Sequence, residues 1–372
     1  MEDETIEDVM DPKEIVKDLE TFISERSSYY KRDSTDISTA RSFSSGFAFT
    51  EDDRAYRGTI KPEVYMNVIM SWRDQLVAMY NNDPFHIGIK TNRKDQMAQV
   101  MRVVLDDVQE SSKLACLIPD IFKKLVDEGF AYGILYTEEV NSQTKQQDLK
   151  FRIIDARKVM VESSDDPTMA DAAKLVVFDV VSKAEIKSKY EKAAELMEYN
   201  SSSVDIFVPD NIDFDSKNQC IIYTFYEKVA EGVKISKVLY KEVLDSVVVP
   251  LSRIPVFRFY GETVYIEDRI HYRGIYHFVM DLLKLVNYTA SELQHKIATT
   301  PSTRWLGDAK ALANHAETFT ANTDSAVAEY DSHDGDKELH APTLLDTDLK
   351  SAGYLNTITS IMTIIKEILG NP

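Results

Sequence analysis

The longest helical pattern of hydrophobic and polar positions in the chain lies between residues 270 and 301. Hydrophobic residues recur there every three or four positions and would form a stripe along one face of an α-helix. Polar residues, among them Asp281 and Lys284, occupy the other faces. From Ile275 to Ala298 such a helix spans roughly 36 Å at 1.5 Å per residue, longer than most globular helices. The stripe consists of Ile275, Val279, Leu282, Val286, Thr289, Leu293 and Ile297.

A second long helical pattern closes the sequence. Its stripe is Leu349, Leu355, Ile358, Met362, Ile365 and Leu369, and Gly370 is expected to cap the helix. Residues 300–348, between the two helices, form a polar module. Its large apolar side chains, Trp305, Phe319 and Tyr330, are too few for an independent core.

Residues 61–270 mix helical and strand periods, which predicts an α+β domain. We expect helices over 61–84 and 94–129, the second capped by Gly129, and a third helix from 183 to 197 capped by Ser182. Gly232 is expected at the bend of a hairpin. Strands are expected over 85–91, 130–140, 148–162, 174–182, 219–229, 233–241 and 242–251.

The N-terminal 60 residues are predicted to form a helix and an arm. Ile15, Leu19 and Ile23 give a helical stripe that begins at Pro12 behind the cap Asp11. Residues 33–53 are rich in Ser, Thr and Asp and are expected to form a long loop. The predicted organisation is therefore 1–60 helix and arm, 61–270 α+β domain, 271–299 first long helix, 300–348 module and 349–372 second long helix.

Composition places the chain among soluble proteins. It has 372 residues, 44% of them hydrophobic, and a net charge of −19, which disfavours a protein that clamps nucleic-acid phosphates with a basic surface. Cys116 and Cys220 are isolated in apolar segments, so we expect no disulfide and a reducing compartment. The N-terminus is acidic, unlike a signal peptide, and no apolar run reaches the length of a membrane span.

No catalytic signature stands out, so an enzyme is the weaker hypothesis. Phosphate-binding glycine loops and the serine-hydrolase and zinc-protease motifs are absent from the sequence. His271 and His277 lie six residues apart and not on one helical face, so we expect ordinary polar roles for them. Two acidic clusters keep a metal-dependent phosphohydrolase or nuclease open as an alternative: Asp210, Asp213 and Asp215, and Asp331, Asp334 and Asp336 with His333 and His340. A monomeric acidic adaptor protein is a third possibility.

The segment from residue 254 to residue 301 resembles the portal proteins of tailed bacteriophages, the head-to-tail connectors, especially those of short-tailed phages. The order of the upstream elements agrees with that family, and the resemblance covers about residues 60–372. The residues that carry it are Ile254, Pro255, Tyr260, Gly261, Tyr272, Arg273, Gly274, Asp281, Asn287, Ser291, Ala298 and Pro301.

The resemblance implies a structural protein without a catalytic site, metal or cofactor. Residues 61–270 would be the wing, 271–299 and 349–372 the two stem helices, and 300–348 the clip. Portal chains continue into a tunnel loop after the second stem helix, so this sequence is expected to lack a C-terminal part. Lys284, Asn287, Ser291, Lys296 and Lys366 are the candidates for the channel wall, and Arg304, Trp305 and Lys310 for the clip contact.

The resemblance also implies partners and a location. Twelve copies would form a ring at one capsid vertex, assembled in the host cytoplasm with the major capsid and scaffold proteins and kept in the virion, with no role for a membrane. The ring would dock the terminase large subunit during genome packaging, then head–tail adaptor and tail proteins, and would pass double-stranded DNA during packaging and ejection. A negative wall suits such a channel, because it does not hold phosphates tightly.

Overall fold

A computed structural model describes residues 11–47, 49–58, 61–82, 87–89, 96–141, 144, 146–190, 193, 206–209, 212–266, 269–299, 304–315, 329–345 and 351–370. The chain divides into two units. Unit 1 comprises Met1–Ser45 and Ile69–Phe278, and unit 2 comprises Gly46–Val68 and Val279–Pro372. The mixture of helices and sheets is consistent with the predicted α+β class. The domain boundaries drawn from the sequence stay predictions.

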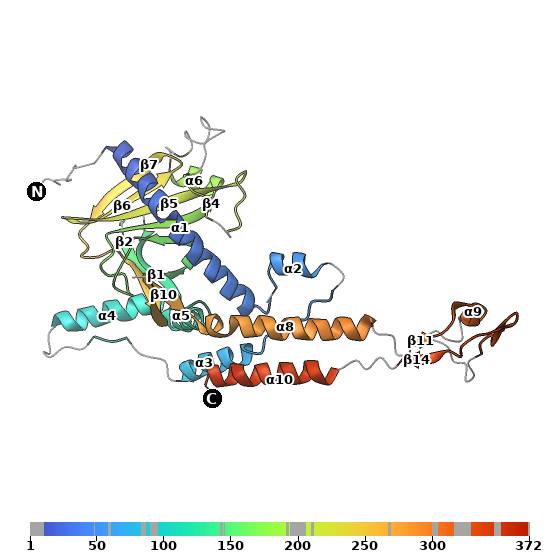
Figure 1. The fold of residues 1–372 in the computed structure, drawn as a ribbon. Helices are drawn as coiled ribbons and strands as arrows, with labels where there is room; N and C mark the ends of the chain where they lie inside the picture. Colours follow the sequence, from blue (N-terminus) through green and yellow to red (C-terminus); the bar gives the residue numbers. More distant parts are fainter. Residues whose placement is uncertain are drawn as a thin grey trace, which may run out of the picture. The chain divides into compact units, whose positions relative to one another are not determined.

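A five-stranded antiparallel sheet lies in unit 1 (Figure 1). Its central strand, β5, is buried on both faces, and successive side chains point to opposite sides. Ile221, Tyr223 and Phe225 share a core with helix α1, whereas Ile222 and Tyr226 belong to cores on the other face. The sheet order is β3 (Val159–Val161), β4 (Lys174–Ser182), β5 (Gln219–Val229), β6 (Gly232–Leu239) and β7 (Glu242–Val249).

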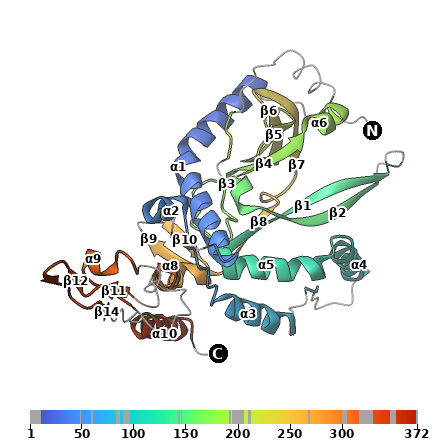
Figure 2. The same ribbon diagram turned by 90° about the vertical axis from the view of Figure 1, so that its right-hand side faces the viewer.

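Strands β4 to β7 confirm the predictions from the sequence, including the hairpin that bends just before Gly232. A second, three-stranded sheet has the order β2 (Gln146–Ile154), β1 (Phe130–Asn141) and β8 (Val256–Tyr260). Figure 2 shows β1 and β2 as a long hairpin. The chain passes from β2 to β3 through the short helix η1 (Ala156–Lys158). The single strand expected over 148–162 is therefore wrong, because those residues form parts of two strands in different sheets. The hairpin of β9 (Glu262–Ile266) and β10 (Arg269–Arg273) was not predicted.

Helix α1 (Pro12–Ser44) is much longer than predicted. The expected loop over residues 33–53 is wrong for its first twelve positions, and also for residues 51–53, which begin the short helix α2 (Glu51–Arg57). Ser34, Ile37, Ala40 and Phe43 are buried at a spacing of three residues, so a sparse stripe continues through the polar segment. In this segment the hydroxyl groups of Thr35, Thr39 and Ser42 donate to carbonyl groups four residues earlier instead of breaking the helix.

The helices before β1 also differ from the prediction. Residues 61–69 are not helical, and α3 begins at Met70 and ends at Asn82. The single helix expected over 94–129 is two helices, α4 (Gln96–Ser111) and α5 (Leu114–Glu128). Lys113 adopts a left-handed conformation between them, with φ of 52°, and Gly129 caps α5 as expected, with φ of 91°.

Two short elements predicted from the sequence differ in the structure. The strand expected over 85–91 is not found at residues 87–89, and its other positions lie outside the described residues. Helix α6 begins after Ser182 as predicted but covers only Lys183–Lys189, and most positions from 191 to 205 lie outside the described residues. Among the helices that the structure describes, none combines the length and the apolar character required to cross a bilayer.

Arg41 joins the second half of α1 to the rest of unit 1. Its guanidinium group donates to both oxygens of Glu128, at 2.8 and 3.0 Å, and to both oxygens of Asp155, also at 2.8 and 3.0 Å. Although burial opposes it, hydrogen bonds from Arg41 and Arg157 hold the pKa of Asp155 well below its ordinary value. The guanidinium group of Arg41 therefore connects α1 with the end of α5 and the start of η1 through two bidentate pairs.

We predict that Arg41→Ala lowers the free energy of unfolding by about 3–5 kcal/mol, because it leaves the buried Glu128 carboxylate without its main cation. Arg32→Ala removes an exposed arginine from the same helix and is expected to change stability by less than about 0.5 kcal/mol. Urea unfolding monitored by circular dichroism measures both. Equal effects of the two substitutions would contradict this role of Arg41.

Candidate functional site: two long helices and the module between them

Helix α8 (Ile275–Thr299) is the predicted long helix, and its bounds agree with the sequence pattern. Its buried face is rotated from the predicted stripe. Leu282, Thr289 and Leu293 are only half-buried, and Ile297 is exposed. The buried positions are Tyr276, Val279, Leu283, Val286, Asn287, Ala290 and Ser291.

Two polar side chains explain the rotated face. Asn287 is 2% exposed and its Oδ1 accepts a hydrogen bond of 2.6 Å from the backbone N–H of Met66. Ser291 is fully buried and its Oγ accepts a hydrogen bond of 2.9 Å from the N–H of Val64. Unit 2 therefore holds the extended segment 61–68 against α8. Asn287 and Ser291 lie off the predicted stripe but are buried. Their role in a channel wall stays a prediction.

Further contacts in unit 2 bind residues 49–63 to the same helix. Lys61 forms an ion pair with Glu292 at 2.7 Å, and the hydroxyl group of Tyr288 donates to Asp53 at 2.9 Å. Arg57 is buried between two aromatic rings, at 4.6 Å from the ring centroid of Phe49 and 5.2 Å from that of Tyr288. Sequence reasoning missed Arg57, since it lies in the segment that was expected to be an arm.

The lysines predicted for a channel wall have different surroundings. Lys284 is half-buried in unit 2. Although burial opposes it, hydrogen bonds from Thr50 and Tyr288 and the nearby charge of Lys284 lower the pKa of Asp53. Lys296 is exposed, and its Nζ lies 4.9 Å from the ring centroid of Tyr354 in α10 (Ser351–Ile368). Lys366 is exposed near the end of α10. The role of these lysines in a channel wall stays a prediction.

Helix α10 confirms that the second long pattern is helical, but its predicted stripe is only partly right, because Leu355 is exposed. Ile358, Ile361 and Ile365 are buried at a spacing of three and four residues. Gly370 follows the helix with φ of 75°, as expected of a cap. Leu355, Ile364 and Ile368 are exposed by 44–53%, so apolar side chains also lie on the solvent side.

The module between α8 and α10 contains short elements closed by a two-stranded pair. Strands β11 (Arg304–Leu306) and β14 (Thr343–Leu345) are antiparallel partners, and Ala311 in α9 (Ala309–Leu312) is fully buried. A tight hairpin of β12 (His333–Asp334) and β13 (Lys337–Glu338) lies between them in the sequence. Asp331 N–H donates to the Ala311 carbonyl at 3.1 Å, which ties this hairpin to α9.

Of the predicted clip residues, Lys310 has described side-chain contacts. It is exposed and forms an ion pair with Asp334. Arg304 and Trp305 occupy β11, where their backbones pair with Leu345 and Leu344. The side chains of these two residues lie outside the part of the chain that is described, so their contact role stays a prediction.

The acidic clusters act within turns and ion pairs. Asp215 accepts from the N–H of Lys217 at 3.0 Å and from the amide of Asn218 at 2.8 Å, which closes the turn before β5. Asp331 accepts from Asn314 and contacts His315. Within the described parts of the chain, no three His, Cys, Asp or Glu side chains are grouped so that they could hold a metal ion. Asp210 is outside those parts.

Three glycines bring backbone segments into direct contact at the start of α8. Gly261 N–H donates to the Gly129 carbonyl at 2.7 Å. A Cβ atom on Gly274 would lie 2.4 Å from the carbonyl oxygen of Asp127, so only glycine fits there. Gly274 N–H donates to Nδ1 of His277 at 3.1 Å, and burial lowers the pKa of His277, so its neutral ring serves as the acceptor.

The other residues of the sequence motif are spread along the same region. Arg273 pairs with Glu262 in the β9–β10 hairpin, and Asp281 is exposed on α8. Pro301 lies outside the described residues. His271 is half-buried in β10, where burial and nearby arginines lower its pKa. The structure therefore explains why glycine occupies position 274: a larger side chain would collide with the backbone of Asp127. The sequence pattern alone does not show this.

Comparison with known protein families gives one match. The family model described as phage P22-like portal protein matches residues 25–242 and 232–370. No curated protein matches the chain. The match covers most of the sequence and includes most of unit 1, both long helices and the module between them.

We predict that Gly274→Ala lowers the free energy of unfolding by about 1–3 kcal/mol, because the new methyl group forces the backbone away from Asp127. Gly353→Ala is the matched control: the space around Gly353 in α10 is open, and alanine is expected to raise stability by up to about 1 kcal/mol. Thermal unfolding of both variants measures the difference, and a neutral Gly274→Ala would contradict the close contact.

A second prediction concerns Asn287. Replacing it with alanine leaves the Met66 N–H without its acceptor and is expected to cost about 1–3 kcal/mol. Amide hydrogen exchange of Met66 should become faster in this variant, while Asn314→Ala, which changes an exposed amide in the module, should leave it unchanged. Unaltered protection of Met66 in Asn287→Ala would show that the segment is held by other contacts.

Proposed function

The chain belongs to the phage P22-like portal proteins, and from that membership we propose that it is a subunit of a ring-shaped portal at a capsid vertex. A portal protein is a structural component of the phage particle. In this proposal unit 1 carries the wing, α8 and α10 are the two stem helices, and residues 300–348 are the clip.

The observation that carries the proposal is the family match, which includes two long helices that flank a small module in unit 2. Both helices have apolar side chains on their exposed sides as well as on their buried sides. Leu285 and Ile297 in α8 are about half exposed, as are Leu355, Ile364 and Ile368 in α10. A helix that is apolar on more than one side is suited to burial against further helices, which neighbouring copies in a ring would supply.

The electrostatics favour transport of DNA over tight binding of DNA. A net charge of −19 per subunit repels phosphates at long range. Lys284, Lys296 and Lys366 would then be isolated positive positions along a mainly negative wall, giving weak contacts that do not arrest sliding. We propose that double-stranded DNA passes through the ring during packaging and ejection.

The partners follow from the same proposal. A closed ring of about twelve copies requires a heterologous interface that repeats around an axis. Capsid and scaffold proteins would contact the ring at the vertex. The clip, with Arg304, Trp305 and Lys310, would bind the terminase large subunit and later the adaptor and tail proteins.

Light scattering of the purified chain tests the proposal. The expected result is a mass about twelve times that of the monomer, at physiological salt and at high salt, because buried apolar contacts between helices are insensitive to screening. A monomer at both salt concentrations would contradict a ring built by this chain. Leu355→Asp with Ile364→Asp should abolish the large species, whereas Lys310→Asp, an exposed change in the module, should preserve it.

A further inference from the structure

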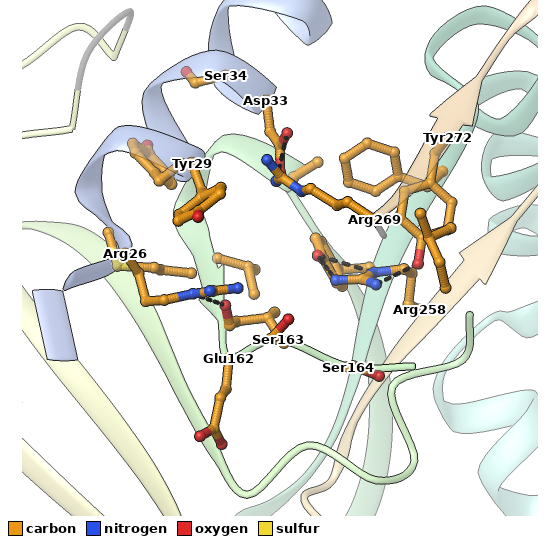
Figure 3. Close-up of a pocket in the computed structure, with 18 of the residues that line it drawn as sticks. Arg26, Tyr29, Asp33, Ser34, Glu162, Ser163, Ser164, Arg258, Arg269 and Tyr272 are labelled. Atoms are coloured by element: carbon orange, nitrogen blue, oxygen red, sulfur yellow. Dashed lines mark hydrogen bonds and ion pairs between the residues drawn. The ribbon is translucent and has the colours of Figure 1, made fainter. Parts of the chain in front are cut away.

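Three arginine side chains from different elements of unit 1 converge on one cavity. Arg26 comes from α1, Arg258 from β8 and Arg269 from β10, and the cavity has a volume of about 100 Å³. Figure 3 shows the three guanidinium groups directed toward a shared space, which is bounded by Tyr29 and by the loop with Ser163 and Ser164. Three positive charges around one cavity repel one another, which is costly unless anionic groups close by balance them.

Arg258 is oriented by phenols instead of carboxylates. Its Nε and one terminal nitrogen donate to the hydroxyl group of Tyr132, at 3.1 and 2.8 Å, and its other terminal nitrogen donates to Tyr272 at 2.5 Å. Among the residues that the structure describes, none provides a carboxylate in an ion pair with Arg258. The two phenols fix the plane of the guanidinium group but neutralise none of its charge.

The other two arginines flank one aromatic ring. The guanidinium carbons of Arg26 and Arg269 lie 4.9 and 4.7 Å from the ring centroid of Tyr29. Arg269 is paired with Asp33 at 3.0 Å. Arg26 donates to the carbonyl of Val161 at 3.2 Å, and no ion pair is formed by its side chain within the described part of the chain. Burial and the proximity of Arg269 lower the pKa of Arg26.

The remaining carboxylates at the cavity are directed elsewhere or are open to water. Glu162 accepts hydrogen bonds from the N–H groups of Ala173 and Lys174, and its side chain points away from the arginines in Figure 3. Asp165 is exposed. Asp33 is therefore the one described carboxylate that forms an ion pair with any of the three arginines, which leaves the charges of Arg26 and Arg258 without a direct partner.

We propose that this cavity binds a small tetrahedral oxyanion, with free inorganic phosphate as its ligand. Guanidinium groups present planar pairs of N–H donors that match the oxygens of phosphate. A volume of about 100 Å³ accommodates such an ion, whereas it is too small for a nucleotide. The bound ion would join α1 to β8 and β10 through their arginines.

Calorimetric titration of the full chain with inorganic phosphate, at constant ionic strength, tests the proposal. The expected result is saturable binding of one phosphate per chain. Arg258→Gln and Arg26→Gln should each weaken binding about tenfold or more, the change expected for loss of a charge-assisted hydrogen bond. If Arg258→Gln does not fold, Arg26→Gln still tests the site. This second substitution removes only one of the hydrogen bonds that the structure describes, the bond from Arg26 to the carbonyl of Val161, so the variant is expected to fold.

Arg152→Gln is the matched control. Arg152 belongs to the same unit and also lies over a tyrosine, Tyr136, but it is paired with Asp179 and does not line this cavity. Unchanged phosphate affinity in this variant supports the site.

The proposal is overturned if the wild-type chain binds no phosphate, or if Arg152→Gln weakens phosphate binding as much as Arg258→Gln does. It is also overturned if acetate binds as tightly as phosphate, or if a short DNA duplex displaces the phosphate.

Discussion

The contact between backbones at Gly129, Gly261 and Gly274 determines how the chain enters α8. The end of α5, the turn after β8 and the last residue of β10 meet there without intervening side chains, and a methyl group on Gly274 would collide with the Asp127 carbonyl. Helix α8 begins at the next residue, so this contact fixes the backbone at the position where the helix starts. Gly274, one of the residues that carry the resemblance to portal proteins, is thus required by the geometry of the fold.

The polar face of α8 shows how a helix proposed for a channel wall can be held by its own chain. Asn287 and Ser291 accept from backbone N–H groups of residues 64 and 66, donors that would otherwise lack partners in an extended segment. This leaves Asp281 and Leu285 on the exposed side of the helix. In the proposed ring, that exposed side is available to neighbouring subunits and to the channel.

The sequence predicted the elements whose periodicity is strong. The apolar run in residues 219–229 and the stripe in 275–298 predicted β5 and α8 with nearly correct bounds. The second half of α1 could not be predicted, because its Ser and Thr residues are typical of loops and the stabilising partners of Arg41 are 87 and 114 residues away. The roles of Asn287 and Arg57 likewise depend on contacts between distant segments. The converging arginines Arg26, Arg258 and Arg269 have no local pattern at all.

The proposed ring of subunits encloses an open channel. Electron microscopy of the purified assembly, with class averages of end-on views, tests this claim most directly. We predict a closed ring with rotational symmetry and a central opening wider than a DNA duplex. Averages that show compact particles without a central opening would contradict the claim.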